Sequence, residues 1–286
     1  MLVVGSSGKF AGLVVPELAK RGVKVRGLVR KSTESDRVIA NGASEIAIGD
    51  LSNQQSMKAA FETVESVFYI APAFISNEAE VGRANVRAAR EAGVRRFVFS
   101  SVIHPVLSEL SNHAAKAPVE EELLDSGIEY TFLHPAMFFQ NFAASWPKVV
   151  DSGVHAEPWS TETRFSRVDF RDVAEVAAIA LTQDRLRYGT FELCAAGHTN
   201  RHDIAALMSE VLGKNIRAEK ADPNKAASGG ASDESEKSEL KAMFDWYDHH
   251  GLLGNSLILS ALLGREPRSL RAYFQELAQG SFGDSK

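Results

Sequence analysis

Apolar residues in the first half of the chain fall into short, nearly continuous runs separated by segments in which they recur at helical spacing. The apolar runs predict buried strands at residues 1–4, 23–29, 43–48, 64–71, 94–101 and 128–135. The intervening segments predict helices at residues 10–21, 52–63, 79–92 and 114–125. Strands that alternate with helices of this length predict an α/β fold, a parallel sheet with helices on both faces, joined by right-handed crossovers. A ligand crevice is then expected at the carboxyl ends of the strands.

The pattern loosens beyond residue 150. Residues 168–183 predict a strand end followed by a helix, residues 188–196 a strand, and residues 199–213 a helix that Asn200 and Asp203 cap. Small and charged residues dominate 221–239, which predicts a mobile loop. The segments 243–254 and 269–278 predict amphipathic helices.

Composition narrows the classes of protein. The chain has 286 residues, 44% of them hydrophobic, and a net charge of -5, so direct nucleic-acid binding is not expected. The sequence contains no apolar stretch of about 18 residues, so no membrane span is expected. The single Cys194 lies in a strand-like run, which predicts a buried thiol and fits a reducing, cytoplasmic location. The first predicted strand begins at once, so a signal peptide is not expected, and whether residues precede Met1 stays open.

The stretch VVGSSGKFAGLVV, Val3–Val15, carries the first candidate chemistry. Gly5 can make a tight turn after the strand, Gly8 can let a pyrophosphate approach the backbone, and a helix then starts. The spacing Gly5-x-x-Gly8-x-x-Ala11 is a variant of the dinucleotide fingerprint. The alternative is a glycine turn that joins a strand to a helix and binds nothing.

The end of the second predicted strand suggests which nucleotide would bind. Arg30 and Lys31 stand where NAD-binding proteins carry an acidic ribose ligand, which favours NADP(H) and predicts weaker binding of NAD(H). A solvated surface pair is the alternative. Asp50 can accept the adenine amino group while Leu51 packs on the ring; Asp50 can also cap the helix that starts near Ser52.

Several longer stretches support a specific resemblance. They are VVGSSGKFAG, LVRK, GDLSN, NVRAAREAGVRRFVFSSV, KAPVEEELLDSGIEYTFLHPAMFFQNF, VDFRDVAEVAAIAL and MFDWYDHHGLLGNSLILSALLGREPRSL. With them the chain resembles the NmrA-like family of atypical short-chain dehydrogenases/reductases over nearly its whole length. The resemblance implies a Rossmann-type doubly wound parallel sheet with a small C-terminal α/β substrate subdomain, and NAD(P)(H) in the cleft between them. The expected core is residues 1–150 with 168–197 returning to it, and the expected subdomain is 151–167 with 198–286.

The resemblance also implies site residues. The phosphate turn would be Gly5, Ser6, Ser7, Gly8, Lys9 and Phe10, with Arg30 and Lys31 at the 2′-phosphate and Asp50 and Leu51 at the adenine. The cofactor would lie over Ala71, Pro72 and Ala73, Lys116 would reach the nicotinamide ribose, and Phe138, Phe139, Gln140 and Asn141 would close over the nicotinamide end.

Short-chain reductases usually act through Tyr-x-x-x-Lys, in which the tyrosine exchanges a proton with the substrate. None of the five tyrosines here precedes a lysine by four positions, and Asn112 stands four residues before Lys116. Lys116 or His113 is therefore the candidate proton donor, although His113 also fits an exposed loop. No metal site is expected at His198, His202 or the adjacent His249 and His250, and no nucleophile at Ser100 or Ser101.

Two functions remain open from the sequence. The first is an NADPH-dependent reductase of a small hydrophobic carbonyl, quinone or enone, with the segments 136–139 and 146–159 lining its pocket. The second is a non-enzymatic redox sensor that passes the state of its cofactor to a protein partner. The missing tyrosine favours the sensor, and both need the lysine.

Overall fold

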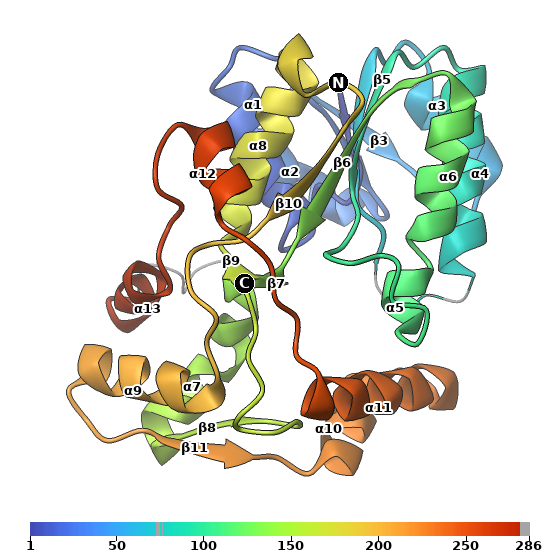
Figure 1. Cartoon of the computed structure of the whole chain (residues 1–286). Helices are drawn as coiled ribbons and strands as arrows, with labels where there is room; N and C mark the ends of the chain where they lie inside the picture. The colour runs from blue at the N-terminus through green and yellow to red at the C-terminus, as the bar shows by residue number, and fades with distance from the viewer. Residues whose placement is uncertain (73–74, 76, 281–286) are drawn as a thin grey trace. The chain divides into compact units, whose positions relative to one another are not determined.

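The computed structural model describes residues 1–72, 75 and 77–280. Its centre is a seven-stranded sheet in the order β10-β6-β5-β4-β1-β2-β3 (Figure 1). The strands are β1 Leu2–Val3, β2 Arg26–Val29, β3 Glu45–Ile48, β4 Ser66–Tyr69, β5 Arg96–Ser100, β6 Glu129–Pro135 and β10 Gly189–Leu193. The pairings from β3 through β6 are all parallel. The predicted α/β fold with a Rossmann-type parallel sheet is confirmed, and its strand order reverses at β1, where such sheets bind ligands.

Helices cover both faces of this sheet, with α3, α4 and α6 on one side and α1, α2 and α8 on the other (Figure 1). They are α1 Val14–Ala19, α2 Ser35–Ala40, α3 Gln54–Phe61, α4 Glu78–Glu91, α5 Ser111–Ala114, α6 Ala117–Ser126 and α8 Phe170–Thr182, with short 3-10 turns at Ala11–Leu13, Ser32–Glu34 and Asp184–Leu186. Phe97 and Phe99 of β5 pack with Phe61, Val86 and Leu123 from the helices on one face. The burial of strand residues on both faces explains their continuous apolar runs.

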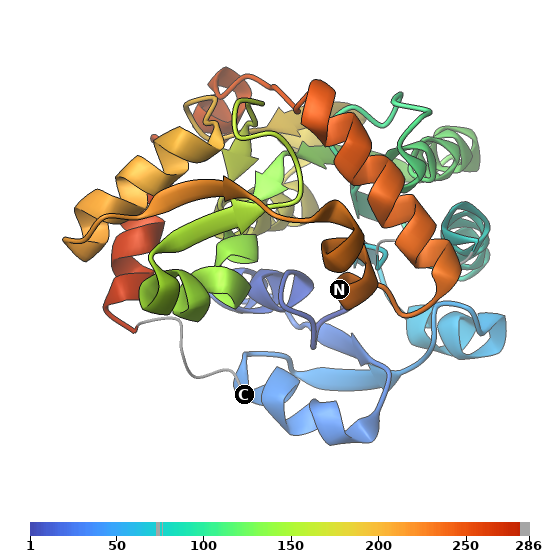
Figure 2. The ribbon, with the colours of Figure 1, turned by 90° about the horizontal axis from the view of Figure 1, so that it is seen from below.

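The chain divides into two compact units. The first comprises residues 1–108, 112–134 and 170–191, and the second comprises 109–111, 135–169 and 192–286. In the second unit β7 Met137–Phe138 pairs with β9 Arg167–Val168. There β8 Val154–Glu157 also pairs with β11 Arg217–Lys220, the yellow-green and orange strands of Figure 2. Its helices are α7 Phe142–Ser152, α9 Arg201–Leu212, α10 Pro223–Gly230, α11 Glu234–His249, α12 Leu257–Leu263 and α13 Leu270–Ala278, and a 3-10 turn covers Phe139–Asn141.

Local capping signals account for several helix boundaries. The side chain of Asn53 accepts the backbone N–H of Ser56 and so caps α3. Asn200 and Asp203 form the predicted reciprocal cap of α9. The first helix is shorter than predicted, because Pro16 has no amide hydrogen and fits only in a first helical turn. A 3-10 turn therefore precedes α1, which starts at Val14.

The prediction of a loop at residues 221–239 is wrong. The segment forms α10 and the first part of α11. Asp222 accepts the backbone N–H groups of Asn224 and Lys225, and Asp233 accepts that of Glu236. These aspartates are strong N-caps, so they start helices in a segment whose composition resembles a linker.

The prediction of a buried thiol is confirmed. Cys194 is fully buried, and burial raises the pKa of its thiol to about 12. In the described part of the chain, none of the helices has the length and apolar character to cross a membrane.

We expect Arg96→Met to lower the free energy of unfolding by about 3 kcal/mol, the range for a buried ion pair that loses one partner. Arg96 is 2% exposed and donates to three backbone carbonyls at the end of α8 and to Glu129 and Asp184. Urea unfolding measures the change. The neighbouring Arg95, which is half exposed and also pairs with Glu129, is the matched control. Arg95→Met should change stability by less than about 1 kcal/mol, and equal losses would contradict the argument.

Candidate functional site

The glycine turn after β1 is tightly closed by its own backbone. Gly5 has a φ of +74°, a conformation that side chains disfavour. The N–H of Gly8 donates to the carbonyl of Gly5 at 2.8 Å, and the N–H of Gly12 donates to that of Gly8 at 3.0 Å. A Cβ at Gly8 would lie 3.0 Å from the Gly5 oxygen. A larger residue at position 8 would therefore require the turn to shift by a few tenths of an ångström.

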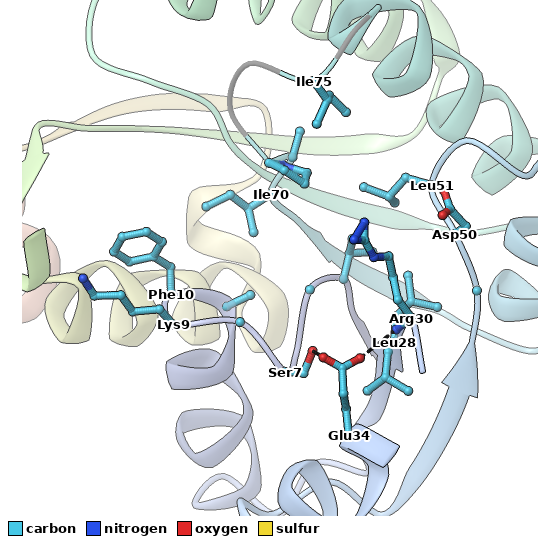
Figure 3. Close-up of a pocket in the computed structure, with 18 of the residues that line it drawn as sticks. Ser7, Lys9, Phe10, Leu28, Arg30, Glu34, Asp50, Leu51, Ile70 and Ile75 are labelled. Atoms are coloured by element: carbon cyan, nitrogen blue, oxygen red, sulfur yellow. Dashed lines mark hydrogen bonds between the residues drawn. The ribbon is translucent and has the colours of Figure 1, made fainter. Parts of the chain in front are cut away.

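This turn forms one wall of a cavity of about 480 Å³ within the first unit (Figure 3). The other walls come from the carboxyl ends of β2, β3 and β4 and the residues that follow them. The predicted site residues that line it are Gly5, Ser7, Gly8, Lys9, Phe10, Arg30, Asp50, Leu51, Ala71 and Pro72. Its size lies in the range of small-molecule and cofactor sites. The cavity also sits where the strand order reverses, as expected for a nucleotide site in such a sheet.

Other predicted residues do not line this cavity. Ser6 is buried beneath the turn and donates from Oγ to the Leu28 carbonyl at 2.9 Å. Lys31 is exposed beside the cavity. Residues 138–141 belong to the second unit, where the Gln140 amide donates to Asp169 at 2.7 Å. Ala73 lies outside the described residues.

A carboxylate that the sequence did not predict stands at the end of β2. Glu34 accepts the Ser7 hydroxyl at 3.0 Å and the backbone N–H groups of Arg30 and Lys31 at 3.2 and 3.1 Å. The Lys31 N–H bond is the main reason that the pKa of Glu34 is lowered, so the carboxylate is ionised. The signal in the sequence was an acid three residues after Lys31, the spacing of a capping box.

Asp50 and Leu51 form the opposite wall. Asp50 is exposed, and its Oδ1 accepts the backbone N–H of Ser52 at 2.8 Å. The alternative that Asp50 caps the following helix is wrong, because α3 starts at Gln54 and its N-cap is Asn53. Leu51 is partly buried in the cavity wall.

Lys116 is the N-cap residue of α6, as Pro118 in the first turn required. Its ammonium is buried and pairs with the buried carboxylate of Glu78, the first residue of α4. Burial lowers the pKa of Lys116 to about 8. The pair does not line the cavity itself. Glu78 is joined to the cavity wall by its backbone N–H, which donates to the carbonyl of Ile75 at 3.2 Å.

The expectation that His113 is an exposed loop residue is wrong. Its ring is buried in α5, and Nδ1 lies 3.3 Å from the His104 carbonyl oxygen. Burial lowers the pKa of His113, so the imidazole is neutral near pH 7. Its role as a proton donor stays a hypothesis.

The sequence also missed a polar cluster formed by the residue after β5, a residue near the end of β6 and a residue of α6. Ser101 Oγ lies 2.5 Å from Glu120 Oε1, and His134 Nε2 lies 2.9 Å from the same oxygen. The three residues come from different segments, so no spacing rule could group them. Ser101 therefore has a carboxylate partner, whereas a serine nucleophile needs a base that accepts its proton and is oriented by a third group.

The histidines that the sequence analysis considered as metal ligands have ordinary partners. His198 Nε2 lies 2.9 Å from the Gly254 carbonyl, and His202 Nε2 lies 2.9 Å from Glu162. The ring of His250 packs on Trp246. Over the residues that the structure describes, no three His, Cys, Asp or Glu side chains come together as metal ligands.

The aromatic residues predicted to line a substrate pocket pack in the core of the second unit. Trp146 stacks on Phe274 with ring centroids 5.3 Å apart. Trp159 meets Tyr247 edge to face at 5.3 Å. Phe139 is 2% exposed. Core packing explains their apolar character without a ligand.

The chain is similar in sequence to two proteins that are named as oxidoreductases. The chain is 27% identical over 226 residues to the NAD(P)H azoreductase of Xenophilus azovorans, covering 76% of this chain and 75% of that protein. It is 23% identical over 216 residues to quinone oxidoreductase 2 of Escherichia coli (strain K12), covering 75% of both chains.

Solved structures share the fold. The triphenylmethane reductase of Citrobacter sp., complexed with NADP(H), superposes with a TM-score of 0.85 at 22% identity and covers 97% of this chain and 99% of its own. At that identity the likeness establishes the fold. The model of the NmrA-like family matches residues 1–278, and the chain therefore belongs to the NmrA-like family.

Proposed function

We propose that this protein is an NADPH-dependent reductase that acts on a small hydrophobic carbonyl, quinone or enone. The observation that carries the proposal is the cavity at the strand-order reversal, with the glycine turn on one side and Arg30 on the other. The relatives named above as an NAD(P)H azoreductase and a quinone oxidoreductase support the same reaction class.

The residues around the cavity fit a phosphorylated dinucleotide. The backbone at Gly8 is open to a pyrophosphate because it carries no side chain. The Arg30 guanidinium has no hydrogen-bond or ion-pair partner among the described residues, so it is free to pair with the 2′-phosphate. Lys31 would add a second cation, and Leu51 would pack on the adenine ring.

Bound NADPH would supply a hydride. The protein must then stabilise negative charge on the acceptor oxygen and deliver a proton to it. Lys116 is the proposed donor, since the family resemblance implies that it reaches the nicotinamide ribose; its ammonium pairs with Glu78, whose backbone N–H donates to the carbonyl of Ile75 in the cavity wall. Residues 138–141 are proposed to cover the nicotinamide end, as the family resemblance implies.

A redox sensor is the second candidate. The observation in its favour is Asn112, which stands four residues before Lys116 in α5 and carries no acidic proton. A sensor would bind NADP(H) at the same cavity and reduce nothing.

One experiment separates the two. NADPH oxidation is followed with a panel of quinones, enones, aldehydes and an azo dye, beside a binding titration of NADPH, NADP⁺, NADH and NAD⁺. Turnover with any acceptor supports the reductase. Tight binding without turnover supports the sensor, and the absence of binding of all four nucleotides contradicts both.

NADP(H) should bind more tightly than NAD(H). Arg30→Ala should weaken NADPH binding by about 1.5–3 kcal/mol, the worth of a hydrogen bond to a charged group, and leave NADH binding nearly unchanged. Dissociation constants measured by fluorescence titration test this. Arg90→Ala, which removes an exposed cation from α4, is the control. Equal affinity of the wild type for both cofactors would refute the claimed preference.

A further inference from the structure

The Glu34 carboxylate fills a position between two segments that both line the cavity. Ser7 approaches it from the glycine turn, and the backbone of Arg30 and Lys31 approaches it from the end of β2. Figure 3 shows Ser7 and Glu34 facing each other, while the Arg30 side chain extends away toward Asp50 and Leu51. Three donors that can serve an anion are thus already occupied by an anion of the protein itself.

Cationic side chains that could attract a ligand phosphate surround the Glu34 carboxylate. Arg30, Lys31 and Arg37 are exposed cations around the carboxylate, and Arg37 donates to the Ser7 carbonyl at 2.6 Å. Arg30 and Glu34 line the same cavity, so a ligand phosphate drawn to Arg30 would share that cavity with the Glu34 charge. Like charges that occupy one small cavity repel each other even in water. Turning the carboxylate away would break its three hydrogen bonds.

A ribose with a free 2′-hydroxyl faces no such repulsion. The hydroxyl is uncharged and can donate a hydrogen bond to a carboxylate. The Glu34 carboxylate therefore disfavours NADP(H) and accommodates NAD(H). The Arg30 guanidinium has the opposite effect, because it favours NADP(H).

We propose that Glu34 is a specificity-determining residue, an internal competitor of the cofactor 2′-phosphate that narrows the preference for NADP(H) and lets NAD(H) bind as well. The proposal rests on the proposed function, because it assumes that the cavity holds a nicotinamide dinucleotide.

Glu34→Gln tests it, since glutamine keeps the length and one accepting oxygen but removes the charge. Dissociation constants are measured for NADPH and NADH, and for the fragments adenosine 2′,5′-bisphosphate and AMP, which isolate the 2′-phosphate. The variant is expected to bind NADPH and the bisphosphate about tenfold more tightly, as removal of a nearby like charge predicts. NADH and AMP should change by less than about threefold, by the same argument.

Asp36→Asn is the matched control. Asp36 is exposed on the neighbouring helix α2 and does not line the cavity. Its replacement by asparagine removes one negative charge, as Glu34→Gln does. Its ratio of NADH to NADPH dissociation constants should stay at the wild-type value. A substitution that disturbs the capped turn Ser32–Glu34 would weaken the binding of both cofactors alike. Such an effect cancels in the ratio of the two dissociation constants.

The outcomes are distinct. An unchanged ratio in Glu34→Gln, or a loss of affinity shared by both cofactors, would reduce Glu34 to a structural cap and overturn the inference while the proposed function stands. A wild-type protein that binds none of the dinucleotides would overturn the proposed function and this inference together.

Discussion

Replacing Lys116 by alanine is expected to lower the turnover number for NADPH oxidation by about 10²–10⁴-fold, the usual range for loss of a proton donor. Lys116 is 6% exposed, and the only oxygen partner of its ammonium among the described residues is the Glu78 carboxylate. A cation removed from water interacts strongly with charge that develops on a reacting oxygen. Stopped-flow or steady-state oxidation with the best acceptor from the panel measures the loss.

Two further variants separate chemistry from packing. Lys116→Met keeps most of the aliphatic stem and removes the charge, so it should be as inactive as Lys116→Ala. Glu78→Gln leaves the Lys116 ammonium without its carboxylate partner, and its effect is measured on the pH dependence of turnover. If the protein is a sensor, the Lys116 variants should instead weaken NADPH binding. Wild-type binding and wild-type turnover in both Lys116 variants would show that this lysine is merely structural.

Turnover should also depend on pH in a defined direction. Burial lowers the pKa of Lys116 to about 8, so the ammonium is present below about pH 8 and is lost as the pH rises through that value. A reaction that needs this proton should therefore slow on the alkaline side. Glu78→Gln should move that limb to lower pH, because the carboxylate favours the charged lysine. An alkaline limb at the same pH in wild type and Glu78→Gln would assign it to another group.

Features that depend on neighbouring residues could be predicted from the sequence. The apolar run at residues 64–71 indicates a strand buried on both faces, and β4 lies in the middle of the sheet. Gly5 and Gly8 mark the turn, because Gly5 adopts a φ of +74° that side chains disfavour and a Cβ at Gly8 would crowd the Gly5 carbonyl at 3.0 Å. At 221–239, however, the average composition was misleading, since two aspartate caps decided the structure.

Features that depend on distant residues could not be predicted. Ser7 and Glu34 meet across 27 positions, and Lys116 and Glu78 meet across 38. No periodicity or short motif reports such pairs. The sequence therefore predicts only cations, Arg30 and Lys31, at the 2′-phosphate end of the site, whereas the structure adds the Glu34 carboxylate there.

Gly8→Val is expected to abolish cofactor binding while the protein stays folded. The valine side chain would stand where the pyrophosphate must approach the turn. Its Cβ would lie 3.0 Å from the Gly5 carbonyl, so the turn itself must also shift by a few tenths of an ångström. Gly8 does not adopt the left-handed conformation that Gly5 does, so a side chain there costs little backbone strain. Titration with NADPH measures binding, and circular dichroism with thermal melting verifies the fold.

A smaller substitution at Gly8 and a matched control at Gly229 test whether the loss of binding is specific to position 8. Gly8→Ala adds only the Cβ and should weaken NADPH binding less than valine does. Gly229→Val makes the same substitution in α10, where an added Cβ meets no atom within 4 Å, and should bind NADPH as the wild type does. Because a pyrophosphate is common to NADPH and NADH, Gly8→Val should lose both, unlike the Arg30 and Glu34 variants, which change their ratio. A folded Gly8→Val protein with unchanged affinity would place the cofactor somewhere other than this turn.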